Sequence, residues 1–351
     1  MAKKQKKKLG KWLTIAAFIA AGVFAFLAYD IYGDIKKPNV VLKNRREAYI
    51  YIPTGSTYDD VFKMLKDSCF IVDAKSFDWV AEQKNYPQLV KAGRFKIVNG
   101  MSNAQLINML RSGAQQPIKI TINKERSLRR LADYVGERLE VDADELFMKL
   151  TDNAYLAKYG KNQATVFSLF VTDTYFFHWN TTADQFVERM HVEYAKFWNK
   201  TRTDKAQKMN LTIDEVCIVA SIVEEETNKT DEKPDIAGVY LNRLRVGMPL
   251  QADPTVKFAI GDFDIRRILR KHLDYDSPYN TYLYKGLPPG PICIPTKSSI
   301  DAVLDHNKHK YLYFCAKDDF SGYHAFARTL IEHNANANKY QKALNKRRIY
   351  K

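Results

Sequence analysis

The chain has 351 residues, of which 46% are hydrophobic, and its formal net charge at pH 7 is +15. This length and apolar content suffice for one large core or for two to three smaller ones, which excludes a disordered chain. Six of the positive charges are lysines at the N-terminus, so the remainder still carries +9. Such a charge favours polyanionic partners in general, namely nucleic acid, anionic lipid or a cell-wall polymer that bears carboxylates.

An uncharged apolar segment follows the N-terminal lysines, from Leu13 to Tyr29. At about 1.5 Å per residue it covers roughly 26 Å, close to the hydrocarbon thickness of a bilayer. Trp12 and Tyr32 are placed to lie at the two interfaces. The segment is longer than the apolar part of a usual signal peptide, and no small-x-small cleavage site ends it. We therefore predict a membrane anchor rather than a cleaved signal.

The charges that flank this segment predict its orientation. Asp30 and Asp34 come before any lysine on the C-terminal side, whereas the N-terminal side carries only lysines. The positive-inside rule then gives a cytoplasmic tail at 1–11 and a single-pass helix at 12–32 of the cytoplasmic membrane. Everything after the helix should face the outer side, where nucleic acid is not a partner.

The first exported part should alternate strands, turns and helices after a polar linker at 33–47. β-Branched and aromatic residues predict strands at Ala48–Ile52, Arg94–Val98 and Ile118–Ile122. Helices should follow the first two strands, with capping boxes at Thr57/Asp60 and Ser102/Gln105 and a stop at Gly113. The spacings differ between the units, so the chain is not a solenoid.

The remainder divides by composition. An intermediate region at 116–205 is polar and rich in predicted helix, with an aromatic cluster at 167–177. The polar composition of the stretch 204–210 predicts a connector. From 206 to 351 the chain combines a buried helix with long loops rich in Gly and Pro. Such loops, attached to a core, are where binding residues usually lie.

The buried helix ends in three consecutive acids. The apolar and small residues Val216–Val223 run directly into Glu224, Glu225 and Glu226. Ionised carboxylates are costly in a core unless they are paired, hydrogen-bonded or protonated. At least one of these acids is therefore a candidate for acid–base chemistry.

Metal and cofactor sites are not expected. The four cysteines, Cys69, Cys217, Cys293 and Cys315, are far apart and show no C-x-x-C or Cys/His pattern. Their mostly apolar surroundings favour small buried side chains. An oxidising compartment would still allow a bridge between Cys293 and Cys315.

Eight short motifs occur in one order in the C-terminal part, and together they carry a family resemblance. They are Ala220–Thr227, Asn242–Leu244, Gln251–Thr255, Tyr279–Tyr282, Gly286–Ile292, Tyr311–Phe314, His324–Phe326 and Glu332–Asn334. In these motifs the chain resembles the endolytic murein transglycosylase family, the membrane-anchored YceG-like proteins. The resemblance implies a LysM-like α/β module at 48–115, a central motif at Asp173–Tyr175 and a mainly helical catalytic domain with added strands and loops at 206–351. The expected fold class is α+β.

The resemblance also implies a reaction. The family cleaves peptidoglycan between N-acetylmuramic acid and N-acetylglucosamine within the strand, without water, and leaves a 1,6-anhydro ring. Ordinary glycosidases need two carboxylates, whereas here the 6-hydroxyl of the substrate is the nucleophile. One Glu can then act first as acid and afterwards as base, provided that burial raises its pKa.

Glu226 is the preferred acid and Glu224 the second choice. Related enzymes place the catalytic Glu at the end of a buried helix, before a small hydroxyl residue, and Thr227 follows Glu226. Glu226 also comes seven residues after Val219 and four after Ile222, which places it on the face that points to the core.

Amide, carboxylate and aromatic side chains of two loops are candidates for lining the sugar groove. They are Gln251, Asp253, Tyr279, Asn280, Thr281 and Tyr282. His324 and His333 are more readily explained as structural histidines, because the reaction needs no second proton carrier.

The chain departs from the family pattern at Thr172, Ala252 and Thr296, in place of a proline, a hydroxyl residue and a glycine. Two other functions stay open. One is a scaffold that binds peptidoglycan without cleaving it, beside wall synthases or division proteins. The other is a hydrolase that uses Asp253 or Glu224 as a second carboxylate and leaves reducing ends.

Overall fold

The computed structural model describes residues 2–43, 45–265 and 267–347, and it is a mixture of helices and short strands. It divides into two compact units. The first comprises residues 1–118 with 177–180, and the second comprises 119–176 with 181–351. The predicted α+β class agrees with this content, and most of the predicted intermediate region falls in the same unit as the predicted catalytic region.

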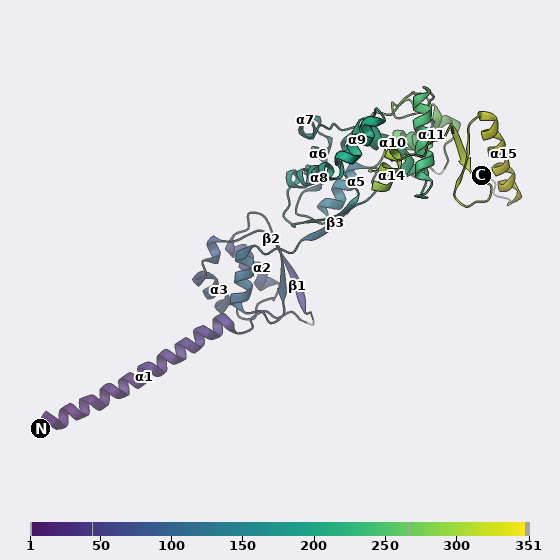
Figure 1. Cartoon of the computed structure of the whole chain (residues 1–351). Coiled ribbons are helices and arrows are strands. Elements are labelled where there is room, and N and C mark those ends of the chain that lie inside the picture. The colour runs from purple at the N-terminus through teal and green to yellow at the C-terminus, as the bar shows by residue number, and fades with distance from the viewer. Residues whose placement is uncertain (1, 44, 266, 348–351) are drawn as a thin grey trace. The chain divides into compact units, whose positions relative to one another are not determined.

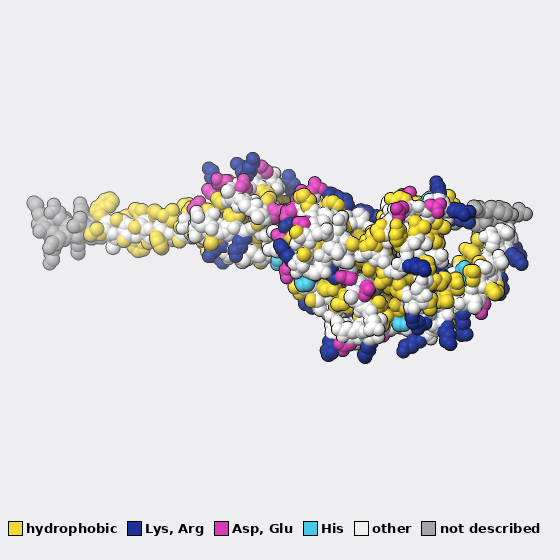
Figure 2. Space-filling model, turned by 90° about the horizontal axis from the view of Figure 1, so that it is seen from above, with side chains coloured by type: hydrophobic (Ala, Val, Ile, Leu, Met, Phe, Trp, Pro, Cys, Tyr) yellow, Lys and Arg dark blue, Asp and Glu magenta, His cyan; other side chains and the backbone are white. Residues whose placement is uncertain are grey.

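The chain begins with one long helix, α1 (Ala2–Lys36). Its segment Lys11–Lys36 is long and apolar enough to cross a membrane. Phe18 and Phe24 are more than 70% exposed, and Figure 2 shows hydrophobic side chains along this helix. Such exposure in water would be unfavourable, so the helix fits a single-pass anchor.

The rest of the first unit is a two-stranded sheet with helices around it (Figure 1). β1 (Glu47–Ile52) pairs antiparallel with β2 (Gly93–Val98), with Ile50 opposite Phe95. The helices are α2 (Tyr58–Asp67), α3 (Ala74–Gln83) and α4 (Asn103–Ser112), with a short 3-10 turn η1 (Tyr86–Gln88). The core includes Ile52, Leu65 and Phe77, all fully buried.

The predicted helix signals of this unit are confirmed. Thr57 with Asp60 and Ser102 with Gln105 form capping boxes, and Gly113 closes α4 with a φ of 74°. That left-handed conformation has no steric cost for glycine.

The expected linker at 33–47 is instead packed into this unit. Residues 33–36 belong to α1, and Val40 and Leu42 are buried in the core. Val40 also forms a β-bridge with Ile71. Although most residues of this segment are polar, Val40 and Leu42 are packed into the core.

The second unit starts with β3 (Ile118–Ile122), which pairs with β4 (Asp173–Phe177). The strand predicted at Ile118–Ile122 is therefore confirmed, and it pairs with part of the aromatic cluster. Between these strands lie α5 (Leu128–Gly136), α6 (Ala143–Thr151) and α7 (Asn153–Leu156), with the 3-10 turns η2 (Ala157–Tyr159) and η3 (Val166–Leu169). α8 (Ala183–Phe197) and α9 (Lys200–Lys208) follow. Most of the expected connector at 204–210 is therefore helical.

The core of the second unit surrounds α10 (Ile213–Glu226). Residues 216–223 are at most 5% exposed, so the predicted buried helix is confirmed. α10 packs against α11 (Lys233–Arg245), α12 (Asp253–Ile260) and α14 (Lys297–Leu304). Because α10 is covered on several faces, residues 216–223 are all apolar or small.

The C-terminal part adds a hairpin and a helix. β5 (Tyr313–Ala316) pairs antiparallel with β6 (His324–Ala327), and α15 (Leu330–Lys346) packs on both strands. A one-turn helix, α13 (Arg270–Leu273), precedes the Tyr279 loop. All four cysteines are free thiols, so Cys293 and Cys315 form no bridge.

Candidate active site

The site is built on the C-terminal end of α10. A capping box of Thr212 and Glu215 starts the helix, and Thr227 ends it in an extended conformation. Three carboxylates in the last turn lie at the negative end of the helix dipole, which disfavours their ionised forms. Each acid therefore needs a partner or a proton.

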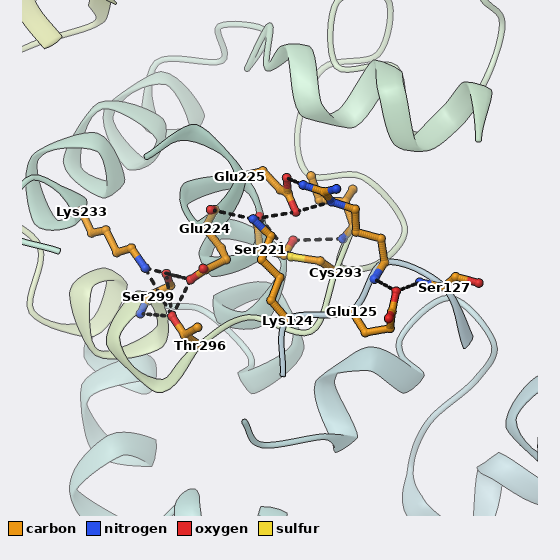
Figure 3. Close-up of polar contacts among 12 residues, drawn as sticks. Lys124, Glu125, Ser127, Ser221, Glu224, Glu225, Lys233, Cys293, Thr296 and Ser299 are labelled. Atoms are coloured by element: carbon orange, nitrogen blue, oxygen red, sulfur yellow. Dashed lines mark hydrogen bonds and ion pairs between the residues drawn. The ribbon is translucent and has the colours of Figure 1, made fainter. Parts of the chain in front are cut away.

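Glu224 is neutralised in a buried polar cluster. Its carboxylate accepts hydrogen bonds from Lys233 at 2.8 Å and Ser299 at 2.5 Å, and a further one from Thr296. Burial alone would raise the pKa of Glu224, but these donors together lower it below its ordinary value. Thr296, which departs from the family pattern, thus has a structural role here. Figure 3 shows this cluster on one side of the helix end.

Glu225 is neutralised by a different set of cations. The guanidinium of Arg126 donates to both carboxylate oxygens, at 2.7 and 2.5 Å, and Lys124 lies 3.1 Å away. Burial would raise the pKa of Glu225, but Arg126 and Lys124 lower it. Glu224 and Glu225 point toward separate partners in Figure 3. Both acids are therefore held as carboxylates.

Glu226 has the opposite character. Burial raises its pKa to about 7, and the negative charges of Asp253 and Glu225 act in the same direction. A hydrogen bond from the Tyr240 hydroxyl, at 2.6 Å, opposes the rise. Glu226 can therefore carry a proton near neutral pH, as a general acid must.

A cavity of about 200 Å³ opens next to this carboxyl. Its lining is mostly polar and comes from α10, α11, the loop before α12, the start of α12, the Tyr279 loop and β5. The lining residues are Glu226, Tyr240, Arg243, Leu250, Gln251, Asp253, Tyr282 and Phe314.

Three of the predicted groove residues line this cavity. Asp253 accepts a hydrogen bond of 2.6 Å from the Tyr282 hydroxyl, so these two side chains fix one another. Gln251 adopts a left-handed φ of 51°, and its backbone N–H donates to the backbone carbonyl of Thr281. A left-handed backbone conformation is rare for residues other than glycine, asparagine and aspartate. Where it does occur, it is often found at functional sites.

The other three predicted groove residues lie elsewhere. Asn280 and Thr281 are 0% and 1% exposed and are not among the residues that line the cavity. The Asn280 side-chain amide donates to the carbonyls of Leu273, at the end of α13, and Tyr275, and the Thr281 hydroxyl accepts from the backbone N–H of Ala252. These two residues hold the loops that carry Gln251 and Tyr282. Tyr279 lines a separate recess.

Two lining residues of α11 were not predicted as site residues. Tyr240 and Arg243 are three positions apart and so share one helical face. Arg243 is only 8% exposed and donates to the carbonyls of Leu312 and Leu250, at 2.6 and 2.8 Å. The available signal was that Arg243 belongs to the motif Asn242–Leu244 and that Tyr240 lies three positions before it, on the same helical face.

The two histidines of the motifs do not line the cavity. His324 forms a 2.8 Å contact with Glu232, and its ring lies against Phe314. His333 stacks on Tyr313, and burial lowers its pKa. Their surroundings fit the structural roles expected from the sequence.

A buried helix that ends in a protonatable Glu beside a polar cavity is a candidate site for acid–base chemistry. The model of the YceG-like family matches residues 50–339 of the chain, which therefore belongs to the YceG-like family. The family resemblance predicted from the motifs is confirmed.

Individual relatives agree with the family. The chain is 30% identical to an endolytic murein transglycosylase of Bacillus subtilis (strain 168), over 90% of this chain and 91% of that protein. It is 27% identical to an endolytic murein transglycosylase of Streptococcus pneumoniae serotype 2, of which it spans 63%. A crystal structure of a YceG-like protein from Listeria monocytogenes superposes with a TM-score of 0.56 at 28% identity, over 83% of this chain and 98% of that one.

Proposed function

We propose that this protein is a membrane-anchored endolytic transglycosylase that cleaves peptidoglycan between N-acetylmuramic acid and N-acetylglucosamine. The observation that carries the proposal is the contrast among three neighbouring acids. Glu224 and Glu225 are paired with cations, whereas Glu226 has a pKa of about 7 and lines a cavity. The names of the relatives support murein as the substrate.

In the proposed reaction Glu226 transfers its proton to the glycosidic oxygen as the bond from that oxygen to C1 of N-acetylmuramic acid breaks. The resulting Glu226 carboxylate takes the proton of the 6-hydroxyl while the 6-oxygen bonds to C1 and closes the 1,6-anhydro ring. Glu226 ends the cycle protonated, and no water is consumed. The carboxylate of Asp253 lines the same cavity and can stabilise positive charge that develops on the sugar ring.

The proposed placement has α1 across the cytoplasmic membrane, with the N-terminus inside and both compact units outside. The lysines before the apolar segment support this orientation. The order β1, α2, α3, β2 with an antiparallel pair supports a LysM-like wall-binding module in the first unit. Wall synthases or division proteins are candidate partners on that side of the membrane.

Product analysis tests the proposal. Purified glycan strands would be incubated with the full chain in detergent micelles and with its Glu226→Gln variant, and the products analysed by mass spectrometry. Internal fragments with anhydro ends that vanish in the variant are the expected result. Intact strands from a folded wild-type protein would refute catalysis and favour the binding scaffold.

Because Asp253 lines the same cavity, hydrolysis with Asp253 as a second carboxylate is the other reaction to test. A hydrolase that used Asp253 as its second carboxylate would produce reducing ends, each of which retains the oxygen of a water molecule. Incubation in ¹⁸O-labelled water separates the two reactions, because the anhydro product takes up no label. Label at the new ends would show that the protein is a hydrolase and not a transglycosylase.

A further inference from the structure

A second recess lies in the same compact unit as Glu226 and has no part in the proposed reaction. Its volume is about 710 Å³, which is within the usual range for a small-molecule site. Its wall combines aromatic rings with side-chain amides. The rings are Phe147, Phe167, Phe258 and Tyr279, and the amides are Asn153, Asn162 and Gln163.

Two distant parts of the sequence build this recess. Phe147 and Gln163 belong to the segment between β3 and β4, whereas Phe258 and Tyr279 belong to α12 and the loop that follows it. The Phe258 and Tyr279 rings pack with their centroids 4.8 Å apart. Phe167, from the segment between β3 and β4, packs edge-on against Phe258 with ring centroids 6.5 Å apart, which joins that segment to the part of the chain that carries Glu226.

Two segments, α12 and the Tyr279 loop, contribute to both the recess and the Glu226 cavity. α12 contributes Asp253 to the cavity and Phe258 to the recess, five residues or about 7.5 Å further along the helix. The Tyr279 loop contributes Tyr282 to the cavity and Tyr279 to the recess. The cavity and the recess therefore share two wall segments of the chain.

The charges around the recess favour an uncharged ligand. Arg126 is bound to Glu225, and Arg129 is bound to Asp133 and Asp144, so both guanidinium groups that line the recess already have carboxylate partners. An acidic stem peptide would find little free positive charge there.

The remaining groups suit an N-acetylated sugar. Aromatic rings pack against apolar ring faces, and amides exchange hydrogen bonds with acetamido and hydroxyl groups. The Gln163 side-chain amide makes no hydrogen bond within the described part of the chain and is exposed. It is thus available to a ligand without loss of an internal contact.

We propose that this recess binds N-acetylated sugar units of the glycan strand away from the bond that is cleaved. The inference rests on the proposed function and adds to it a preference for long glycan strands. A strand long enough to fill both the cavity and the recess gains contacts that a short one lacks. Binding then favours long strands, with cleavage inside them.

A binding experiment in the Glu226→Gln background tests the recess without turnover. The probes are chitin oligosaccharides, which are uncharged chains of N-acetylglucosamine, in one short and one long form. Titration calorimetry of the full chain in detergent should show the long form bound about tenfold more tightly than the short one. Phe147→Ala or Gln163→Ala should remove most of that gain and leave the short form unchanged.

Met148→Ala is the matched control, because Met148 follows Phe147 on α6, is 62% exposed and does not line the recess. It should retain the full gain. Gln163→Ala removes an exposed side chain and keeps the test valid if Phe147→Ala fails to fold. Retention of the length-dependent gain in a folded Gln163→Ala variant and in a folded Phe147→Ala variant would overturn the inference.

Cleavage assays with Glu226 intact separate this inference from the proposed function. Equal preference for long strands in the wild type and both recess variants, with anhydro products from all, would refute the recess and leave the reaction standing. A wild type that cleaves nothing, but whose length-dependent binding needs Phe147 and Gln163, would support the recess as a saccharide site and refute the reaction.

Discussion

Glu226 and its two acidic neighbours at the C-terminal end of α10 differ in chemistry although they are the same residue type. Glu224 and Glu225 point toward separate cations, which lower the pKa of each. Glu226 instead meets the Tyr240 hydroxyl and the negative charge of Asp253, and its pKa rises to about 7. The difference shows that the packing around each acid, more than its place in the sequence, decides its protonation.

Exchange of the acids one at a time is the strongest challenge to this contrast. Glu226→Gln should lower the initial rate of glycan cleavage about 10²- to 10⁴-fold, because an amide cannot transfer a proton to the leaving oxygen. The rate is measured as the release of anhydro-ended fragments. Glu225→Gln is the matched variant and should reduce the rate much less. Equal losses in the two variants would show that Glu226 is not the acid.

Removal of a cation that pairs with one of the neighbouring acids should affect stability strongly. Lys233→Met leaves Glu224 in a buried site with no cationic partner, which should cost about 3–5 kcal/mol of the free energy of unfolding. Urea unfolding in detergent measures this loss. Lys205→Met breaks an exposed pair with Asp305 and should cost less than about 1 kcal/mol. Losses of the same size would contradict the buried role of Lys233.

The pH dependence of the free energy of unfolding tests the raised pKa of Glu226. The pKa of Glu226 is about 7 in the folded chain against an ordinary 4.5. The folded state therefore binds this proton more tightly, and the associated stability is fully present below pH 4.5 and is lost as the pH rises through 7.

Glu226→Gln should remove this dependence. Relative to the wild type, the variant should gain roughly 1–3 kcal/mol between pH 4.5 and pH 8, as measured by unfolding at both values. The Gln side chain can still accept the hydrogen bond from Tyr240, so packing stays comparable. A difference between the two proteins that does not change with pH would mean that folding leaves the pKa of Glu226 at its ordinary value.

The smallest expected effect concerns Tyr240. Its hydrogen bond stabilises the ionised form of Glu226, so Tyr240→Phe should raise the pKa of Glu226 further. The pH above which cleavage slows should move upward by less than about one unit. Tyr313→Phe, on β5, is the control and should leave the profile in place. A downward shift in Tyr240→Phe would contradict the direction of this bond.

Local features of the chain could be predicted from the sequence because they depend on neighbours in the sequence. Examples are the buried α10, the two capping boxes and the stop at Gly113. The preference for Glu226 came from helical spacing and from the family resemblance, and its catalytic role stays a prediction. Gln251, Asp253 and Tyr282 were named in advance and do line the cavity.

Long-range contacts could not be predicted in the same way. Arg126 and Glu225 are 99 positions apart, and nothing near either residue identifies the other. The pairing of β3 with β4 also joins segments about fifty residues apart. Asn280 and Thr281 have polar side chains that suit a sugar, but tertiary packing uses them to hold loops. Which polar group faces a ligand is decided by the fold.

The junction between α1 and the first unit has a consequence for where the protein works. α1 packs its last turns against α3 and α4, and the Asn103 amide donates to the carbonyl of Asp34 at 2.9 Å. In the proposed orientation this contact fixes the first unit at the bilayer surface, without a long tether. That unit would then sample only the innermost layer of the wall, where new strands emerge, and material further out would be beyond its reach.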